Sequence, residues 1–318
     1  MNHTSHLSVG LIGLGRMGQN HLRVLSMLKG VEIVFISDSD EDLAKRLGSI
    51  YGVNAVCDPS LCFAEVDAVV ICTPTVTHAE YIQLAGRTVR NIFVEKPIAS
   101  TVEEARQVAE FVAAEGLNLQ VGFIERFNPA VQGLKSVLDK TGQVISIDFT
   151  RTNKLSSRIT DVDVVTDLMI HDIDLALYLN GPARSVVAHG FAHEKMIDFA
   201  SALITHQNGR FSRIQASRIT DKKVRLIEAT CLDKYVDCDL LRKEIIIIRQ
   251  SKIKPGDGQP YTISAIQETV EVPPQEALLS EMQAFVASCQ NVNEKLPGAE
   301  AGWAAMQICS LIQQEVAV

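Results

Sequence analysis

Three glycines between an apolar segment and a helix-like segment constrain this chain more than any other feature of its sequence. Residues 7–12 fit a buried strand, and Gly13-Leu14-Gly15-Arg16-Met17-Gly18 follows directly, before apolar residues that recur at helical spacing. In such a unit the first glycine permits a tight turn, the second lets the backbone approach a pyrophosphate, and the third lets the helix pack on the strand. We therefore predict that Gly13, Gly15, Arg16, Met17 and Gly18 bind a dinucleotide, with its phosphates at the helix N-terminus.

An aspartate after the second apolar segment indicates which dinucleotide binds. Residues 31–36 end in Ser37-Asp38, and Asp38 lies twenty positions after Gly18. A carboxylate there accepts hydrogen bonds from the adenosine ribose hydroxyls and repels a 2′-phosphate, so we predict NAD rather than NADP as the cofactor. The alternative role for Asp38 is that of a helix cap or turn residue, and one side chain can fill both roles.

The next segments continue the alternation of strands and helices. Residues 66–72 form a strand candidate that ends in Thr73-Pro74, which we expect beside the nicotinamide ribose. His78 directly precedes a helix candidate over residues 79–85. Its side chain either contacts the cofactor or has a structural role as a cap or packing residue. Strand candidates at 90–94 and 117–121 flank a helix at 101–115. This spacing predicts a parallel, doubly wound sheet, the Rossmann type of α/β fold.

The triplet Glu95-Lys96-Pro97 closes the strand candidate at 90–94. The carboxyl ends of strands in open α/β sheets form the rim where ligands bind, so Glu95 and Lys96 are predicted at the cofactor and substrate. A solvated lysine in a tight turn is the alternative. The following Ser100-Thr101-Val102-Glu103 is predicted to be a capping box that starts the next helix.

Composition limits the classes of partner. The chain has 318 residues, 47% of them hydrophobic, and a net charge of -8, and its basic residues are scattered. This length favours two domains, and this charge argues against nucleic acid or an anionic membrane surface as a partner. No targeting segment or apolar run of spanning length is evident, so we expect a cytoplasmic protein. The seven cysteines form no Cys-x-x-Cys pair, which predicts reduced thiols and no metal site.

The pattern changes after Gly122, which we take as the domain boundary: residues 1–122 form the NAD-binding domain, and residues 123–318 form a domain for substrate binding and oligomerisation. In the segment 123–129, Asn128 and Pro129 are the predicted N-cap and first residue of a helix that runs to about residue 139. Glu125 and Arg126 lie at the boundary, where ligand sites are common. They either contact substrate or form an ion pair with each other.

A predicted helix over residues 162–179 carries a polar stripe. Asp167 and His171 are four residues apart, and Asp174 and Tyr178 continue the same stripe. An acid four residues before a histidine can fix the tautomer of the ring and raise its basicity, which suits a general base. A helix-surface ion pair is the alternative.

Seven strand candidates follow at short intervals, at residues 186–192, 199–206, 210–218, 224–231, 235–240, 244–249 and 261–267. This spacing predicts a large, mostly antiparallel open sheet in a C-terminal α+β domain. Two helices, 275–289 and 299–316, are predicted to close the chain. Because a large sheet needs its second face covered, we expect a homodimer or homotetramer through this sheet.

Together these motifs resemble the glucose-fructose oxidoreductase, inositol dehydrogenase and rhizopine-catabolism (Gfo/Idh/MocA) family of nicotinamide enzymes. The resemblance rests on the glycine motif, on Glu95-Lys96-Pro97 and on Asp167-x-x-x-His171, and it covers essentially the whole chain. It implies an NAD-dependent dehydrogenase in which Lys96 and His171 flank the reacting carbinol and Asp167 supports the histidine. Either Lys96 or His171 could take the proton.

Within the family, the segments 122–129 and 167–174 are similar to those of the UDP-N-acetylglucosamine 3-dehydrogenases. That similarity implies a 3-keto nucleotide sugar as product, for a PLP-dependent aminotransferase on the way to a diamino sugar of lipid A. Glu125, Arg126, Asn128, Arg151, Arg158, Asp167 and His171 are the expected substrate residues, with the three arginines as candidates to meet a diphosphate. A free polyol or monosaccharide is the alternative substrate. A non-catalytic NAD-binding sensor is the alternative function, although it would be expected to lack Lys96 or His171.

Overall fold

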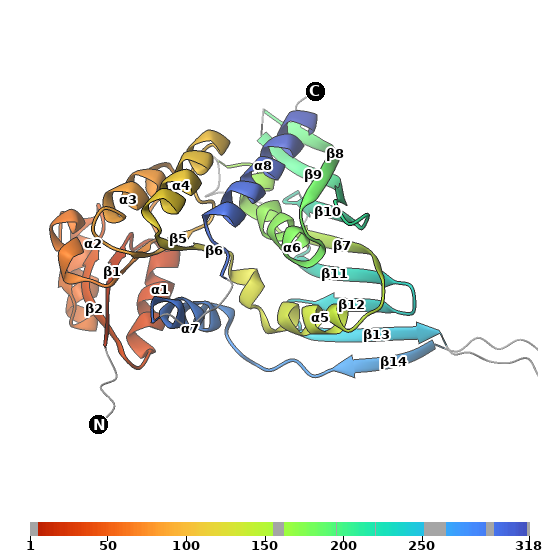
Figure 1. The fold of residues 1–318 in the computed structure, drawn as a ribbon, viewed down its shortest axis with the longest axis horizontal. Helices are drawn as coiled ribbons and strands as arrows, with labels where there is room; N and C mark the ends of the chain where they lie inside the picture. Colours follow the sequence, from red (N-terminus) through yellow and green to blue (C-terminus); the bar gives the residue numbers. More distant parts are fainter. Residues whose placement is uncertain are drawn as a thin grey trace, which may run out of the picture. The chain divides into compact units, whose positions relative to one another are not determined.

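The computed structural model describes residues 6–154, 162–194, 196–219, 221–250, 265–290 and 296–316. The chain forms two compact units, drawn in Figure 1. The first unit is Met1–Ile124 with Ala277–Gln307, and the second is Glu125–Glu276 with Ile308–Val318. The predicted division after Gly122 is therefore corrected in one respect, because residues 277–307 belong to the first unit.

The first unit is built around a parallel sheet of six strands in the order β3-β2-β1-β4-β5-β6. Its elements are β1 (Leu7–Ile12), α1 (Arg16–Met27), β2 (Val31–Ser37), α2 (Glu41–Tyr51), β3 (Asn54–Ala55), β4 (Ala68–Ile71), α3 (His78–Ala85), β5 (Asn91–Glu95), α4 (Val102–Glu115), β6 (Asn118–Gly122), α7 (Ala277–Cys289) and the first part of α8 (Ala299–Val316), with short 3₁₀ helices η1 (Pro59–Glu65) and η2 (Thr75–Thr77). The doubly wound parallel sheet is confirmed, and its strand order reverses between β1 and β4. Ligands bind at such a reversal in open α/β sheets.

Local sequence signals set the helix ends of this unit. The capping box of α4 lies one residue later than predicted: Thr101 accepts a hydrogen bond from the backbone N–H of Glu104, and Glu104 accepts one from the N–H of Thr101. The helix ends at Gly116, whose φ of 61° is the left-handed conformation of a glycine C-cap. This capping fixes where the chain turns after Glu95-Lys96-Pro97.

Helix α7 belongs to the first unit because it completes that unit's core. Leu278, Met282 and Phe285 are buried in one apolar cluster with residues of α1, β1 and β5. The rings of Phe285 and Phe93 meet edge to face, with their centroids 5.6 Å apart. This pairing could not be predicted from the sequence, since it joins segments almost two hundred residues apart.

The second unit contains a mixed sheet of eight strands in the order β14-β13-β12-β11-β7-β10-β9-β8. Its elements are α5 (Pro129–Asp139), β7 (Val144–Thr152), the π-helical turn η4 (Val165–Met169), α6 (Ile170–Asn180), β8 (Ala183–His193), β9 (Met196–His206), β10 (Phe211–Ser217), β11 (Val224–Cys231), β12 (Tyr235–Asp239), β13 (Glu244–Gln250), β14 (Ala265–Val270) and the end of α8, with the 3₁₀ turn η3 (Ile124–Phe127) at its start. All neighbouring strands are antiparallel except β7 and β10. The predicted mostly antiparallel sheet is confirmed.

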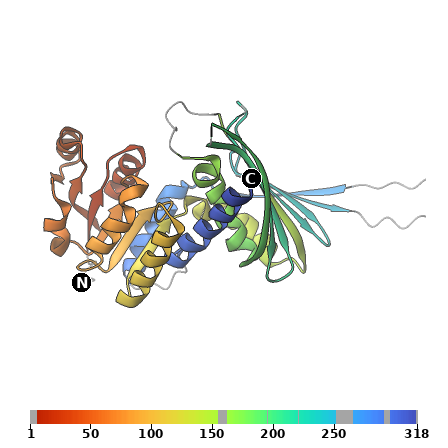
Figure 2. The same ribbon diagram turned by 90° about the horizontal axis from the view of Figure 1, so that it is seen from above.

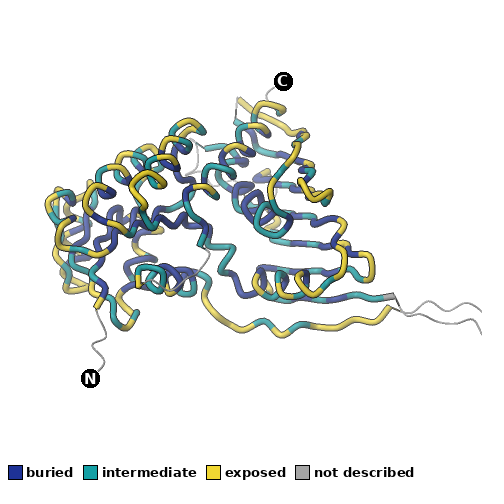
Figure 3. Tube along the Cα trace, in the orientation of Figure 1, coloured by how far each residue is buried: buried dark blue, intermediate teal, exposed yellow. Residues whose placement is uncertain are grey.

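The two faces of the second sheet differ. Figure 2 shows helices packed on one face, where Ala188, Ala202 and Ile214 are buried, and no described helix on the other. On that other face Val187, Phe191 and Leu203 are exposed, and β14 is exposed along its length at the sheet edge, as Figure 3 shows. Among the residues that the structure describes, no helix has the length and hydropathy to cross a membrane.

The packing of α7 makes a stability prediction. Phe285→Ala removes a fully buried ring from the core of the first unit. We expect it to lower the free energy of unfolding by about 3–5 kcal/mol, the usual cost of such a cavity. Leu61→Ala, at a side chain that is 78% exposed, is the control and should change it by less than about 0.5 kcal/mol. Urea unfolding followed by circular dichroism checks both, and equal midpoints for Phe285→Ala and the parent would contradict the packing.

Candidate active site

The glycine turn lies where the strand order reverses, and its close contacts admit no side chain. Gly13 has a φ of +89°, and a Cβ on it would lie 2.5 Å from the carbonyl carbon of Cys72 at the end of β4. A Cβ on Gly18 would lie 1.9 Å from the carbonyl oxygen of Gly13. The turn therefore packs directly on the end of the neighbouring strand, as the sequence predicted for a dinucleotide loop.

The N-terminus of α1 fits an anionic ligand. Gly15 is the N-cap, it makes no side-chain capping bond, and the first turn of the helix contains no acidic residue. A Cβ on Gly15 would meet nothing within 4 Å, and Arg16 and Met17 are exposed beside it. The first N–H groups of the helix and its positive dipole end are thus available to a pyrophosphate.

Asp38 follows β2 and holds the glycine turn. One carboxylate oxygen accepts a hydrogen bond of 2.5 Å from the N–H of Leu14, and the other accepts one of 2.8 Å from the N–H of Asp40. The helix-cap alternative for Asp38 is wrong, because Asp40 caps α2. Asp38 is a turn residue, and its two hydrogen bonds orient the carboxylate toward the predicted position of the ribose hydroxyls.

A cavity of about 560 Å³ joins these parts of the first unit. Gly13, Gly15 and Asp38 line it, and Thr73 and Pro74 after β4 line it too. Thr77 and Tyr81 are among the lining residues that sequence reasoning missed, since nothing in the spacing set them apart. The hydroxyl of Thr77 donates to that of Thr73 at 2.8 Å. These residues fit an NAD molecule laid across the carboxyl ends of β1 and β4.

His78 holds the Glu95-Lys96-Pro97 turn against the end of β4. It is 1% exposed, its Nδ1 lies 2.8 Å from the carbonyl oxygen of Pro97, and its Nε2 lies 2.9 Å from that of Thr73. Burial lowers the pKa of His78, although both carbonyl contacts and the charge of Glu95 oppose the change. Both ring nitrogens are taken by backbone oxygens, so the geometry favours the packing alternative over direct cofactor contact.

A second buried histidine holds Glu95. Nε2 of His21, in α1, lies 2.8 Å from Oε1 of Glu95, and Oε2 of Glu95 accepts a hydrogen bond from the N–H of Lys96. Glu95 thus holds the turn within the protein, and its contact with the cofactor stays a prediction. Lys96 itself is half-buried next to this carboxylate.

The same corner contains Cys72, which the sequence did not connect with His21. Ligand atoms of His21, Cys72 and Glu95 lie within 4.8 Å of one another, a grouping that could hold a metal ion. Burial, together with the charges of Glu95 and Glu281, raises the pKa of the Cys72 thiol well above its usual value. A metal ion bound there would have to displace the thiol proton.

In the second unit, Asp167 and His171 lie on a helix that begins with a π-helical turn. The predicted helix over residues 162–179 is present, but η4 replaces its first regular turn and α6 begins at Ile170. Asp163 holds the turn, since its carboxylate accepts hydrogen bonds from the N–H of Thr166 and from Gln313 of α8. Such turns often occur at functional sites, and both Asp167 and His171 are half-buried.

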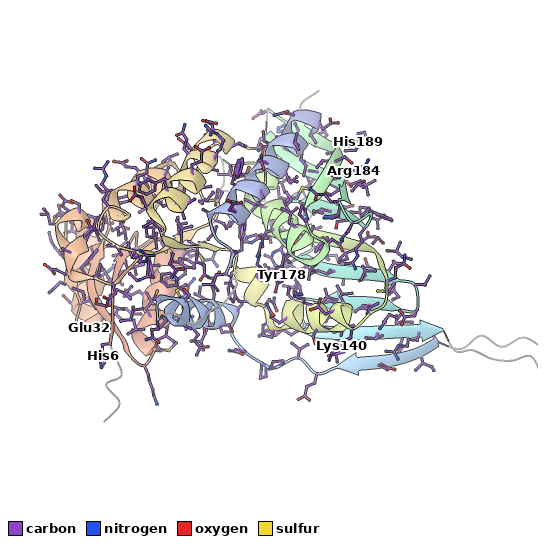
Figure 4. All side chains as sticks on the ribbon, viewed as in Figure 1. His6, Glu32, Lys140, Tyr178, Arg184 and His189 are labelled. Atoms are coloured by element: carbon purple, nitrogen blue, oxygen red, sulfur yellow. The ribbon has the colours of Figure 1, made fainter. Side chains whose placement is uncertain are left out.

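Arg126 forms its ion pair with the polar stripe of α6 and not with Glu125. Its guanidinium donates to both oxygens of Asp174, at 2.8 and 2.6 Å, and lies 4.7 Å from the ring centre of Tyr178, which Figure 4 labels. The predicted ion pair between Glu125 and Arg126 is wrong, because each of them has another partner.

Arg151 forms a buried charge network. It is 1% exposed and donates to both oxygens of Asp172, each at 2.7 Å, and to Glu125 at 2.9 Å. Burial alone would raise the pKa of Glu125. The charge and hydrogen bond of Arg151 outweigh this effect, so the pKa of Glu125 lies below its usual value. The side chain of Asn128 caps α5, as predicted, and also donates to Glu125. Arg151 thus has no surface for a diphosphate, and its predicted role there is corrected to a structural one.

Arg225 is a candidate that sequence reasoning missed. It lies on β11 directly opposite Arg151 on β7. Its neighbours depend on the register of β11 against β7, which could not be read from the sequence pattern. Arg158, the remaining predicted diphosphate residue, lies outside the described residues.

The comparisons with known proteins agree with this geometry. The sequence profile of the "Oxidoreductase family, NAD-binding Rossmann fold" matches residues 7–123, and that of the "GFO/IDH/MocA C-terminal domain" matches residues 142–231. A UDP-N-acetylglucosamine 3-dehydrogenase of Acidithiobacillus ferrooxidans is 30% identical over 284 residues, which are 88% of each chain. The chain belongs to the Gfo/Idh/MocA oxidoreductase family. It is an NAD-binding oxidoreductase.

Two further relatives extend over nearly all of this oxidoreductase. An inositol 2-dehydrogenase of Rhizobium meliloti is 28% identical over 97% of this chain and 96% of its own. The solved structure of UDP-N-acetylglucosamine 3-dehydrogenase GnnA from A. ferrooxidans superposes with a TM-score of 0.87 at 27% identity, covering 98% of both chains. Both domains of the family are therefore present in full.

The geometry of Asp38 makes a prediction about cofactor choice. Asp38→Asn keeps a hydrogen-bond acceptor for the glycine turn but removes the negative charge. We expect the ratio of NAD to NADP affinity to fall by roughly 10- to 100-fold, because the variant repels the 2′-phosphate less and accepts more weakly from the ribose. Calorimetric titration with each dinucleotide measures the ratio. Asp42→Asn, on the exposed side of α2, is the control, and an unchanged ratio in Asp38→Asn would contradict the assignment.

Proposed function

We propose that this oxidoreductase uses NAD to oxidise a secondary hydroxyl of a sugar, namely the 3-hydroxyl of UDP-N-acetylglucosamine, to the 3-keto sugar. The observation that carries the proposal is the likeness to the UDP-N-acetylglucosamine 3-dehydrogenase of A. ferrooxidans over both domains, at 30% identity and a TM-score of 0.87. The cavity at the glycine turn supports the cofactor part of the proposal.

Lys96 is proposed to stabilise the alkoxide that develops on the reacting oxygen. The first unit supports such a role because the turn that carries Lys96 is fixed on both sides: His78 contacts the carbonyl of Pro97, and Glu95 accepts from the N–H of Lys96. A positioned cation that is half-buried stabilises negative charge better than a mobile one in water. NAD supplies the hydride acceptor at the nicotinamide C4 when it is bound.

His171 is proposed to take the hydroxyl proton, with Asp167 as the residue that supports the imidazole. The π-helical turn and the Asp163 cap hold this segment in the second unit. Asp172, the residue after His171, is fixed by Arg151, so the first turn of α6 cannot rotate without breaking a buried ion pair. Lys96 and His171 could exchange the roles of acid–base catalyst and charge stabiliser.

A second substrate class is favoured by a specific observation. The inositol 2-dehydrogenase of R. meliloti aligns with 97% of this chain, more than the first relative does. A free polyol therefore remains the alternative substrate. The non-catalytic sensor is disfavoured, because Lys96 and His171 are both present.

We also propose that two or four copies associate through the second sheet. The exposed apolar side chains Val187, Phe191 and Leu203 on the face without described helices support this, because a second copy would cover them. The 3-keto product would need a further enzyme, and a PLP-dependent aminotransferase acting on the ketone is the proposed functional partner.

The substrate proposal is tested by following NADH absorbance with UDP-N-acetylglucosamine, myo-inositol and glucose as separate substrates. We expect turnover with the nucleotide sugar, and absence of turnover with it would contradict the substrate assignment. Lys96→Met should lower kcat by roughly 10²- to 10⁴-fold and leave NAD affinity within about threefold. Lys29→Met, at an exposed lysine of the same unit, is the control. Retained turnover in Lys96→Met would remove Lys96 from the mechanism.

The oligomer proposal predicts the effect of a charge in the exposed sheet face. Leu203→Lys should shift the protein to the monomer in sedimentation velocity, because an interface would have to bury the new ammonium group. Leu232→Lys, at a side chain that is 74% exposed in the turn after β11, should leave the mass unchanged. A monomeric parent protein would rule out the association.

A further inference from the structure

Arg225 lies on the helix-covered face of the second sheet, at the sheet end that carries Arg151. In the pairing of β11 with β7, Arg225 is opposite Arg151 and Leu226 is opposite Thr150. Side chains of directly opposed residues on antiparallel strands extend from the same face, with Cβ atoms about 4.5–5.5 Å apart. The Arg225 side chain therefore extends beside that of Arg151, whose guanidinium binds Asp172 on the first turn of α6.

The two carboxylates nearest this pair of arginines already have other partners. Both oxygens of Asp172 accept from Arg151. One oxygen of Glu125 accepts from Arg151, and the other accepts from Asn128. Asp172 and Glu125 thus neutralise the buried Arg151, and each of their carboxylate oxygens already accepts a hydrogen bond.

Arg225 differs from Arg151 in exposure and in pairing. It is half-buried, and among the described residues none forms a hydrogen bond or an ion pair with its guanidinium. Burial and the charge of Arg151 lower its pKa, while the charges of Glu125, Asp172 and Asp167 oppose that shift. A guanidinium that is partly removed from water and adjoins a second one is stabilised by an added anion.

The surroundings of Arg225 include the catalytic segment. Arg151, directly opposite Arg225, binds Asp172, and Asp172 follows His171 in the first turn of α6. The charge of Asp167, in the preceding turn η4, also acts on Arg225. A substrate held at His171 would therefore be near enough for a charged group several bonds from the reacting carbon to meet Arg225. Of the chemical groups in a nucleotide sugar, the diphosphate matches a planar guanidinium.

We propose that Arg225 binds the diphosphate of a nucleotide-sugar substrate and so discriminates it from a free sugar. This inference rests on the proposed function and names a new residue for a recognition role that the sequence predicted for Arg126, Arg151 and Arg158. The guanidinium donates to the phosphate oxygens and contributes to substrate affinity, and it takes no part in hydride or proton transfer.

The test uses the full-length protein with NAD bound, and compares Arg225→Gln, Arg225→Lys and Arg242→Gln with the parent. Arg242 is the matched control, an arginine of the same unit that is 77% exposed in its side chain. Calorimetry measures the affinity for UDP, and steady-state assays measure kcat and KM for UDP-N-acetylglucosamine. NAD affinity and the unfolding midpoint report on folding.

We expect Arg225→Gln to weaken UDP binding and to raise the KM by roughly 10- to 100-fold, the effect of losing a hydrogen bond to a charged group. Its kcat should stay within about threefold of the parent, because the residue acts on binding alone. Arg225→Lys should recover part of the affinity, since it restores the charge without the planar fork. Arg242→Gln should match the parent in every measurement.

The outcomes separate this inference from the proposed function. If the parent oxidises UDP-N-acetylglucosamine and Arg225→Gln has an unchanged KM, the role of Arg225 is overturned and the function stands. If the parent binds UDP through Arg225 without oxidising UDP-N-acetylglucosamine, the function is overturned and the role of Arg225 stands. If the parent binds no UDP, the role of Arg225 is overturned, and the oxidation assay alone decides the function.

Discussion

The ion pair between Arg151 and Asp172 is the constraint on which the second unit depends. Two charges buried this deeply cost several kcal/mol each, and they are tolerated only where the geometry is bidentate and the remaining donors are used. Glu125 uses a further donor, so β7, α6 and the segment before α5 are held by one guanidinium. A shift of α6 by one residue would unpair these charges. The position of His171 is therefore set by electrostatics as much as by apolar packing.

The first unit reaches a similar result with two buried histidines. His21 and His78 come from different helices, and each uses its ring to hold one part of the Glu95-Lys96-Pro97 turn. Neither histidine is exposed, and burial lowers the pKa of His78. The lysine that the turn presents is the half-exposed group between them. In both units the residue proposed to act on substrate lies next to buried side chains that hold its segment in place.

The sequence predicted the parts of the fold that depend on local periodicity and turn chemistry. The doubly wound parallel sheet, the glycine turn and the Asn128 cap follow from residues within a few positions of one another, whereas the short strand β3 was not predicted. What could not be predicted depends on distant pairing. Helix α7 joins the first unit through Phe285 and Phe93, and the partners of Arg126 and Arg151 were missed because an arginine can choose among several acids. Arg225 was missed for the same reason, since strand register decides its neighbours.

The path of the chain affects how it can fold during synthesis. The first unit receives Leu278, Met282 and Phe285 only after the whole sheet of the second unit has been made. Residues 6–124 therefore leave the ribosome with one side of their core uncovered, and that side stays open while roughly 150 more residues are added. The second unit is an insertion within the first in chain order.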